Sequence, residues 1–170
     1  MKDYISQIQS FPLFSGIAPQ ELDTMLTCLG SCIRDYRRGE MIILLNESVK
    51  YIGIIITGTV HMVKEDVWGN KTILALMGNG EIFGETFSCG SLTTSSVAFS
   101  AASHCTVLFL PFYRVLHSCN LTCVFHHRLI ENMVQMIAGK NAQLMEKIEI
   151  ISRKSLREKI LTYLSIQRCV

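Results

Sequence analysis

The fold is decided by residues 51–64, YIGIIITGTVHMVK, in which Gly58 separates two β-branched apolar runs. Runs rich in Ile, Val and Thr form strands, and a glycine between two of them marks a turn. Similar short runs occur at residues 41–45, 72–77, 96–101 and 106–110. Such regular spacing is typical of an antiparallel sandwich or barrel. The sequence therefore predicts a mainly β domain with some helix, an antiparallel β-roll or jelly roll between Tyr36 and Leu110.

Helical patterns flank this β-roll on both sides. A short helix is predicted at residues 22–29, because Pro19 and the acidic Glu21 suit a helix start. Beyond Pro111, apolar residues return at helical spacing from about residue 123 to 152. This spacing predicts one long helix that leaves the β-roll.

The long helix carries an apolar stripe with the period of a coiled coil. The members are spaced alternately four and three apart: Ile130, Val134, Ile137, Asn141, Leu144, Ile148 and Ile151. A 3.5-residue period predicts a parallel homodimer about this helix, in which a single Asn fixes the register. The alternative is an ordinary amphipathic helix docked on its own domain, since only about three heptads are present.

A fresh helix is predicted from Ser155, which has Glu158 in the capping-box position. It carries Leu156, Ile160 and Leu164 on one face and stops at Val170. We expect it to be the start of a further domain. The expected division is an effector-binding β-roll domain with a helical N-terminal segment at 1–116, a dimerisation helix at 117–153 and this truncated beginning at 154–170.

Composition narrows the class of protein. A formal net charge of +2 is too mild to indicate a nucleic-acid or membrane surface. No signal peptide and no membrane helix of about 20 apolar residues is evident, so we expect a cytoplasmic protein. The seven cysteines are odd in number and lie mostly within apolar patterns, which favours reduced thiols.

The segment most like a binding site is residues 80–86, GEIFGET, followed by the hydroxyl cluster TTSS at 93–96. Glycines let the backbone approach a ligand, free amides attract an anion, and hydroxyls add neutral hydrogen bonds. A glycine-bounded turn between two strands is the plain alternative.

Four motifs together resemble the Crp/Fnr family of bacterial transcription regulators. They are LFSG at 13–16, RGE at 38–40, IIITGTV at 54–60 and GEIFGE at 80–85. The resemblance implies a homodimer whose effector lies between the β-roll and the long helix and changes the pose of two DNA-binding domains. It also implies that residues 154–170 begin a winged helix-turn-helix domain. The chain ends before a recognition helix, so we expect no specific binding of promoter DNA.

The resemblance also implies roles in the segment 80–86, which we call the cassette, and in the hydroxyl cluster that follows it. In members that bind cyclic nucleotides, the glutamate of the Gly-Glu pair contacts the ribose, and an Arg-Ser or Arg-Thr pair holds the phosphate. Glu85 matches the first role, but the pair falls at Ser95-Ser96, and no Arg or Lys occurs between Lys71 and Arg114. A buried phosphate without a charged partner costs several kcal/mol, so weak or absent binding of cyclic AMP and cyclic GMP is predicted.

A small organic effector of low charge, such as a carboxylate or aromatic acid, suits this neutral, hydroxyl-lined site better. Glu85 either recognises a hydroxyl or amine of the ligand or caps its own turn. From the long helix, Lys140 either supplies a positive charge or is solvated, and Asn141 either reaches the ligand or fixes the coiled-coil register. The candidate effector-binding residues are Gly84, Glu85, Thr86, Ser95, Ser96, Lys140 and Asn141.

A second hypothesis is a redox, haem or iron–sulfur sensor of the same fold, and a third is an effector-free dimerisation module. Two thiol pairs have helical spacing, Cys28 with Cys32 and Cys119 with Cys123. A cluster needs about four ligands, so we expect no metal and no cofactor, with His126 and His127 on a helix surface. The sequence has no His-x-His pair of a cupin and no Gly-x-Ser-x-Gly, so we expect no enzyme.

Overall fold

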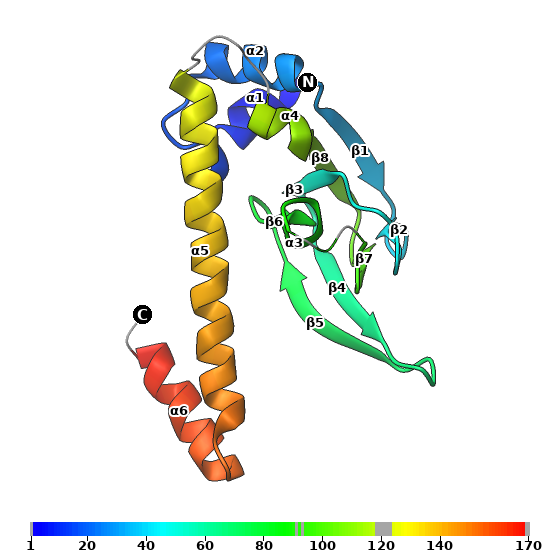
Figure 1. The fold of residues 1–170 in the computed structure, drawn as a ribbon, viewed down its shortest axis with the longest axis vertical. Helices are drawn as coiled ribbons and strands as arrows, with labels where there is room; N and C mark the ends of the chain where they lie inside the picture. Colours follow the sequence, from blue (N-terminus) through cyan, green and yellow to red (C-terminus); the bar gives the residue numbers. More distant parts are fainter. Residues whose placement is uncertain (1, 91, 93, 118–123, 169–170) are drawn as a thin grey trace. The chain divides into compact units, whose positions relative to one another are not determined.

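Two four-stranded antiparallel sheets face each other (Figure 1). One has the order β1-β8-β3-β6, made of Cys32–Tyr36, Cys105–Pro111, Tyr51–Thr57 and Ile82–Phe83. The other has the order β2-β7-β4-β5, made of Met41–Ile43, Ala98–Ala101, Val60–Glu65 and Lys71–Met77. The predicted antiparallel β-roll is confirmed.

The structure is a computed structural model and describes residues 2–90, 92, 94–117 and 124–168. It divides into two units, residues 1–130 and 131–170, and the division falls within the long helix α5, Val124–Ser152. The first unit contains both sheets and the helices α1, α2, α3 and α4.

The continuous apolar run of β3 arises because this strand is buried on both faces. Ile55 belongs to the core between the two sheets. Ile52, Ile54 and Ile56 are also fully inaccessible, and by strand alternation they face the opposite side. There α1 contacts β3, and Gln7 of α1 donates its Nε2–H to the Ile56 carbonyl at 3.0 Å. A strand covered on both faces has no polar alternation.

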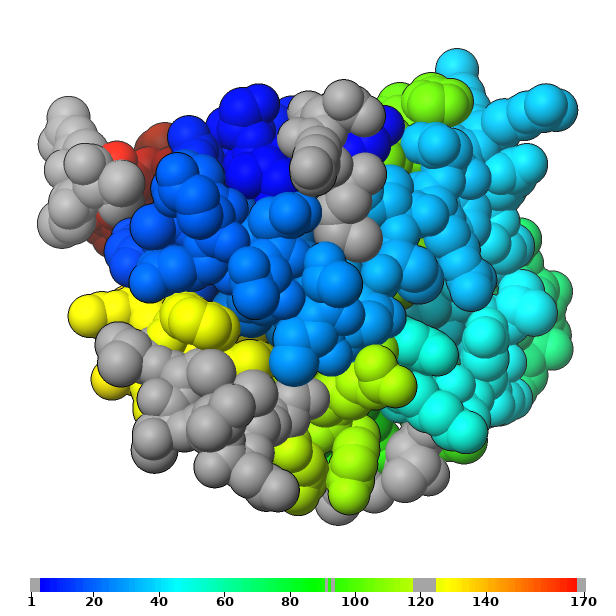
Figure 2. Space-filling view, turned by 90° about the horizontal axis from the view of Figure 1, so that it is seen from above, coloured from blue at the N-terminus to red at the C-terminus, as the bar shows by residue number. Residues whose placement is uncertain are grey.

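The N-terminal segment forms the helical layer over this sheet. It consists of α1, Lys2–Ile8, the 3-10 helix η1, Pro12–Phe14, and α2, Pro19–Leu29. A further helix, α4, Phe112–His117, contacts the end of β8. In Figure 2 the residues of α1 and α2 form a continuous surface beside those of β1. The helix predicted at 22–29 is confirmed and begins three residues earlier, at Pro19.

Six strands were predicted and are present, with small shifts at their ends. The run at 41–45 ends as a strand at Ile43, because Asn46 turns the chain with a φ of 64°. The run at 96–101 begins as a strand only at Ala98. The sequence analysis missed β1 and the two-residue β6, since neither has a long apolar run.

The second unit holds the rest of α5 and the final helix α6, Leu156–Arg168. The capping box predicted at the start of α6 is confirmed. Ser155 Oγ accepts a hydrogen bond from the Glu158 amide at 3.2 Å, and Glu158 Oε2 accepts one from the Ser155 amide at 3.1 Å. Among the described residues, no helix has both the length and the apolar character needed to span a bilayer.

Candidate functional site

The cassette predicted at residues 80–86 follows directly from the strand β6. Phe83 of β6 pairs with Gly53 of β3. Its ring is 1% exposed and packs 5.2 Å from the Phe99 ring and 6.3 Å from the Phe109 ring, measured between centroids. These contacts fix the start of the cassette against the core between the sheets.

Gly84 then turns the chain with a φ of 80° into the short helix α3, Glu85–Ser88. A Cβ at this position would lie 3.2 Å from the Tyr51 carbonyl oxygen. Both the left-handed conformation and the close backbone approach therefore require glycine. The Glu85 side chain is buried, with 8% of its surface exposed, whereas Thr86 is exposed. Burial of a carboxylate this deep is costly unless it serves a structural or binding purpose.

The loop that carries Ser95 and Ser96 is held by the segment after β2. The Ser95 amide donates to the Glu47 carbonyl at 2.8 Å, and its carbonyl accepts from the Asn46 amide at 2.7 Å. Ser95 is fully buried, and its hydroxyl donates to the Val97 carbonyl at 2.6 Å. This hydroxyl supports the loop, and its contact with an effector stays a prediction.

Lys64 brings a positive charge to the same loop, and the sequence analysis missed it. From β4 its ammonium donates a hydrogen bond to the Ser96 carbonyl at 2.6 Å. The segment between Lys71 and Arg114 contains no Arg or Lys, but Lys64 reaches this loop from the neighbouring strand. The register of β4 with β7, in which Val63 is opposite Ala98, brings it there.

The structure thus collects Gly84, Glu85 and Thr86 at one turn and Ser95 and Ser96 in the next loop, all within the first unit. Lys140, half-buried, and Asn141, exposed, lie on α5 in the second unit. Their contribution to an effector site stays a prediction.

The groups considered for a metal site are scattered. Cys28 is exposed, Cys32 is half-buried on β1, and Cys119 and Cys123 lie outside the described residues. Within the described part of the chain, no three His, Cys, Asp or Glu side chains gather in a way that would hold a metal ion.

The prediction that His126 lies on a helix surface was wrong, because its side chain is only 6% exposed, whereas His127 is exposed as expected. Among the described residues, neither ring nitrogen of His126 finds a hydrogen-bond partner. Burial lowers its pKa, and the neighbouring His127 adds to the effect. The helical pattern gave no sign of this burial.

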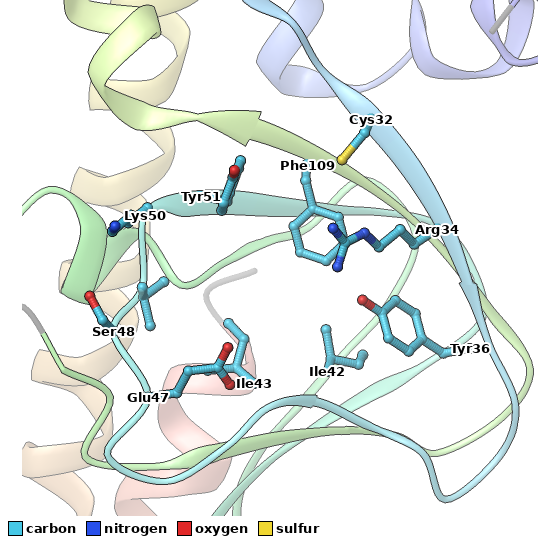
Figure 3. A pocket seen from close by; sticks show the side chains of 11 residues that line it. Cys32, Arg34, Tyr36, Ile42, Ile43, Glu47, Ser48, Lys50, Tyr51 and Phe109 are labelled. Atoms are coloured by element: carbon cyan, nitrogen blue, oxygen red, sulfur yellow. The ribbon is translucent and has the colours of Figure 1, made fainter.

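A separate pocket of about 140 Å³ opens between β1 and β2, the edge strands of the two sheets (Figure 3). Its aromatic wall consists of Tyr36, Tyr51 and Phe109. Its charged side chains are Arg34, Glu47 and Lys50, and the remaining lining is Cys32, Ile42, Ile43, Ser48 and Val49. None of the predicted effector residues lines it. One indication of this pocket was present in the sequence: Cys32, Arg34 and Tyr36 alternate along the chain, which would place their side chains on one face of a strand.

Electrostatic coupling fixes one side of this pocket. The Arg34 side chain hydrogen bonds with Tyr36, which raises the pKa of Arg34. Burial raises the pKa of Tyr36, and the Arg34 cation partly opposes that rise. The guanidinium carbon lies 5.8 Å from the centroid of the Phe109 ring. Arg34 thus lines the pocket while it stays exposed to solvent.

Comparison with known proteins yields one family model, the cyclic nucleotide-binding domain, which matches residues 33–119. The cyclic AMP receptor protein of Thermus thermophilus is 26% identical over 151 residues, which are 88% of this chain and 66% of that protein. The chain therefore spans slightly less than two thirds of the curated relative that it matches.

Solved structures share the fold. A cyclic nucleotide-binding domain from Methylobacillus flagellatus superposes with a TM-score of 0.76 at 14% identity, covering 91% of this chain and 88% of that one. The sensor domain of the transcriptional regulator DNR from Pseudomonas aeruginosa gives a TM-score of 0.61 at 16% identity, covering 92% and 99%. At such identities, the likeness concerns the fold alone.

Proposed function

Because the chain belongs to the family of cyclic nucleotide-binding domains, we propose that it is the sensor and dimerisation part of a bacterial, cytoplasmic transcription regulator of the Crp/Fnr type. Its proposed effector is a small molecule of low charge other than cyclic AMP or cyclic GMP. In this proposal, DNA is read by a part of the regulator other than the β-roll and α5. No catalytic role is proposed.

One observation carries the effector proposal: the cassette keeps its glutamate but has no arginine. Glu85 is buried directly after the glycine turn, as a group that recognises a neutral hydroxyl or amine would be. By the family resemblance, Ser95 falls where the phosphate-binding arginine is expected, and it is buried and bonded within its own loop. A bound cyclic phosphate would lack the bidentate partner that normally compensates its desolvation.

Lys64 is a poor substitute for that arginine. Its residue is exposed, and its ammonium is already bonded to the Ser96 carbonyl. A lysine also offers a strongly hydrated point charge without the planar fork of a guanidinium. We therefore assign Lys64 to the support of the loop.

A thermal-shift screen of uncharged and monoanionic metabolites tests the effector proposal. A ligand present at about 100 times its Kd stabilises by about 2.7 kcal/mol, which is about 5–10 °C for a protein of this size. At least one compound should produce such a shift with the wild type and not with Glu85→Gln. The matched control is Glu81→Gln, since Glu81 is exposed and its Oε2 accepts a hydrogen bond from the Gly78 amide at 2.6 Å. No hit, or equal shifts in both variants, would overturn the proposal.

The dimer proposal is supported by the apolar stripe of α5. Its side chains remain largely exposed in the single chain: Val134 57%, Leu144 55%, Ile148 59% and Ile151 65%. Ile130 and Ile137 are half-buried, and Asn141 is exposed. A row of half-exposed apolar residues at coiled-coil spacing is stabilised by pairing with a second copy.

Sedimentation equilibrium of Ile148→Asp tests the dimer. Burying the exposed half of an isoleucine stabilises by about 1 kcal/mol in each chain, so its loss alone weakens the dimer about 30-fold, and the introduced charge weakens it further. Gln143→Asp makes the same charge change off the stripe and should leave the dimer intact. A monomeric wild type, or equal dissociation of both variants, would contradict the proposal.

A further inference from the structure

The pocket between β1 and β2 is a second place where this fold can hold a ligand. It exists because the two sheets do not close at this edge, where β1 ends one sheet and β2 ends the other. It lies wholly within the first unit. It shares no lining residue with the cassette, and its interpretation is independent of the proposed function.

The inner part of the pocket is an aromatic and aliphatic chamber. The rings of Tyr36 and Tyr51 each approach the Phe109 ring edge to face, with centroids 6.4 Å apart in both pairs. Ile43 and Val49, buried in the same core as Phe109, complete the apolar wall. Figure 3 shows the side chains of Phe109, Tyr36 and Ile43 around one open volume. At about 140 Å³ it is comparable to a cavity of about 150 Å³ that binds benzene.

The charged side chains at the rim of the pocket favour a ligand of negative charge. Arg34 and Lys50 outnumber the single carboxylate, Glu47, and leave one net positive charge. Glu47 also has a local partner, because its Oε2 accepts a hydrogen bond from the Leu44 amide at 2.8 Å. The Arg34 guanidinium carbon lies 5.8 Å from the centroid of the Phe109 ring, so its cation stands beside the aromatic wall of the pocket. A guanidinium is suited to bind a carboxylate through two parallel hydrogen bonds.

We propose that this pocket binds a monocyclic aromatic carboxylate, with the ring in the chamber beside Phe109 and the carboxylate on Arg34. The single ring matches the volume, and the single negative charge matches the net charge of the rim. An aromatic cation of the same size would be disfavoured by the net positive charge of the rim.

Benzoate is the probe, and benzylamine is its matched control with the opposite charge. Amide chemical shifts of the ¹⁵N-labelled chain are recorded during titration of each compound. We expect benzoate to shift the amides of Arg34, Tyr36 and Tyr51 with a Kd on the order of 1 mM, and benzylamine to shift none of them. The same titration is repeated with Arg34→Gln and with Arg38→Gln, an exposed arginine that does not line the pocket.

Loss of a charge-assisted hydrogen bond should weaken benzoate binding at least about tenfold in Arg34→Gln and leave Arg38→Gln unchanged. Because Arg34 is exposed, its replacement should not disturb folding, and an unchanged amide spectrum in the absence of benzoate verifies this. Amide shifts confined to residues 84–86 would place benzoate in the cassette. That result would overturn the proposal of a second site but would not contradict the proposed function. The absence of shifts, binding of benzylamine, or equal affinity in both variants would also overturn the second site.

Discussion

Gly53→Ala should destabilise the first unit because Gly53 makes room for the ring that anchors the cassette. A methyl group there would lie 2.6 and 2.8 Å from Cε1 and Cε2 of Phe83 and closer still to Cζ. The ring cannot move away, since it is 1% exposed and is held between Phe99 and Phe109. Overpacking of this kind costs about 1–3 kcal/mol, and the rigid surroundings place this case near about 3 kcal/mol.

Urea denaturation of a double-mutant cycle with Phe83→Leu isolates the clash. Leucine ends at Cδ and lacks the three ring atoms that the methyl group meets. Gly53→Ala should therefore cost close to zero in the Phe83→Leu background, because alanine suits a strand better than glycine. The predicted coupling between the two positions is about 3 kcal/mol, and the Tm of Gly53→Ala alone should fall by about 6–12 °C.

Gly139→Ala is the matched glycine control. Apart from the backbone of its own helix, no described residue lies within 4 Å of a Cβ at this position on α5, so the change should stabilise the helix by up to about 1 kcal/mol. Costs of Gly53→Ala that agree within about 0.5 kcal/mol in the two Phe83 backgrounds would refute the reasoning.

Two further changes test a buried histidine and a helix cap. Because burial lowers the pKa of His126, the unfolded state gains a proton as the pH falls below about 6.5 while the folded state does not, so the free energy of unfolding should decline there. His126→Phe should flatten that decline in urea titrations between pH 5 and 8 and raise stability, and an unchanged slope would count against the assignment. Ser155→Ala should cost about 1 kcal/mol and fray the first turn of α6 in amide chemical shifts, because the bond to the Glu158 amide is lost. Ser165→Ala, which removes only a bond to a carbonyl three residues earlier, should be neutral, and equal fraying would disprove the role of the cap.

The β-roll could be predicted because its signals are local. The strands β3 and β8 are covered on both faces, so their sequences are largely apolar runs that can be recognised in a single sequence. The cap at Ser155 is equally local, since it depends on a residue three positions away. Features that depend only on nearby residues can be recognised in a single sequence without knowledge of the fold.

The parts that were missed depend on contacts across the sheets. Lys64 and Ser96 are 32 residues apart and meet only through the pairing of β4 with β7. The pocket similarly combines residues of β1 with Phe109 of β8, and no spacing along the chain predicts this contact. His126 was expected on a helix surface, but packing in the folded chain encloses it. The burial of a side chain and the charges around it depend on residues that are distant in the sequence, and a local sequence pattern does not reveal these residues.

Isothermal titration calorimetry with cyclic AMP and cyclic GMP tests the central claim most directly. Loss of the phosphate partner costs about 3 kcal/mol, which raises a Kd of about 1 µM to about 150 µM. The full chain should therefore show no binding of either nucleotide below about 100 µM, although Glu85 and the glycine turn retain the form of the cassette. A submicromolar Kd for either nucleotide would contradict the claim that Ser95 has altered the effector.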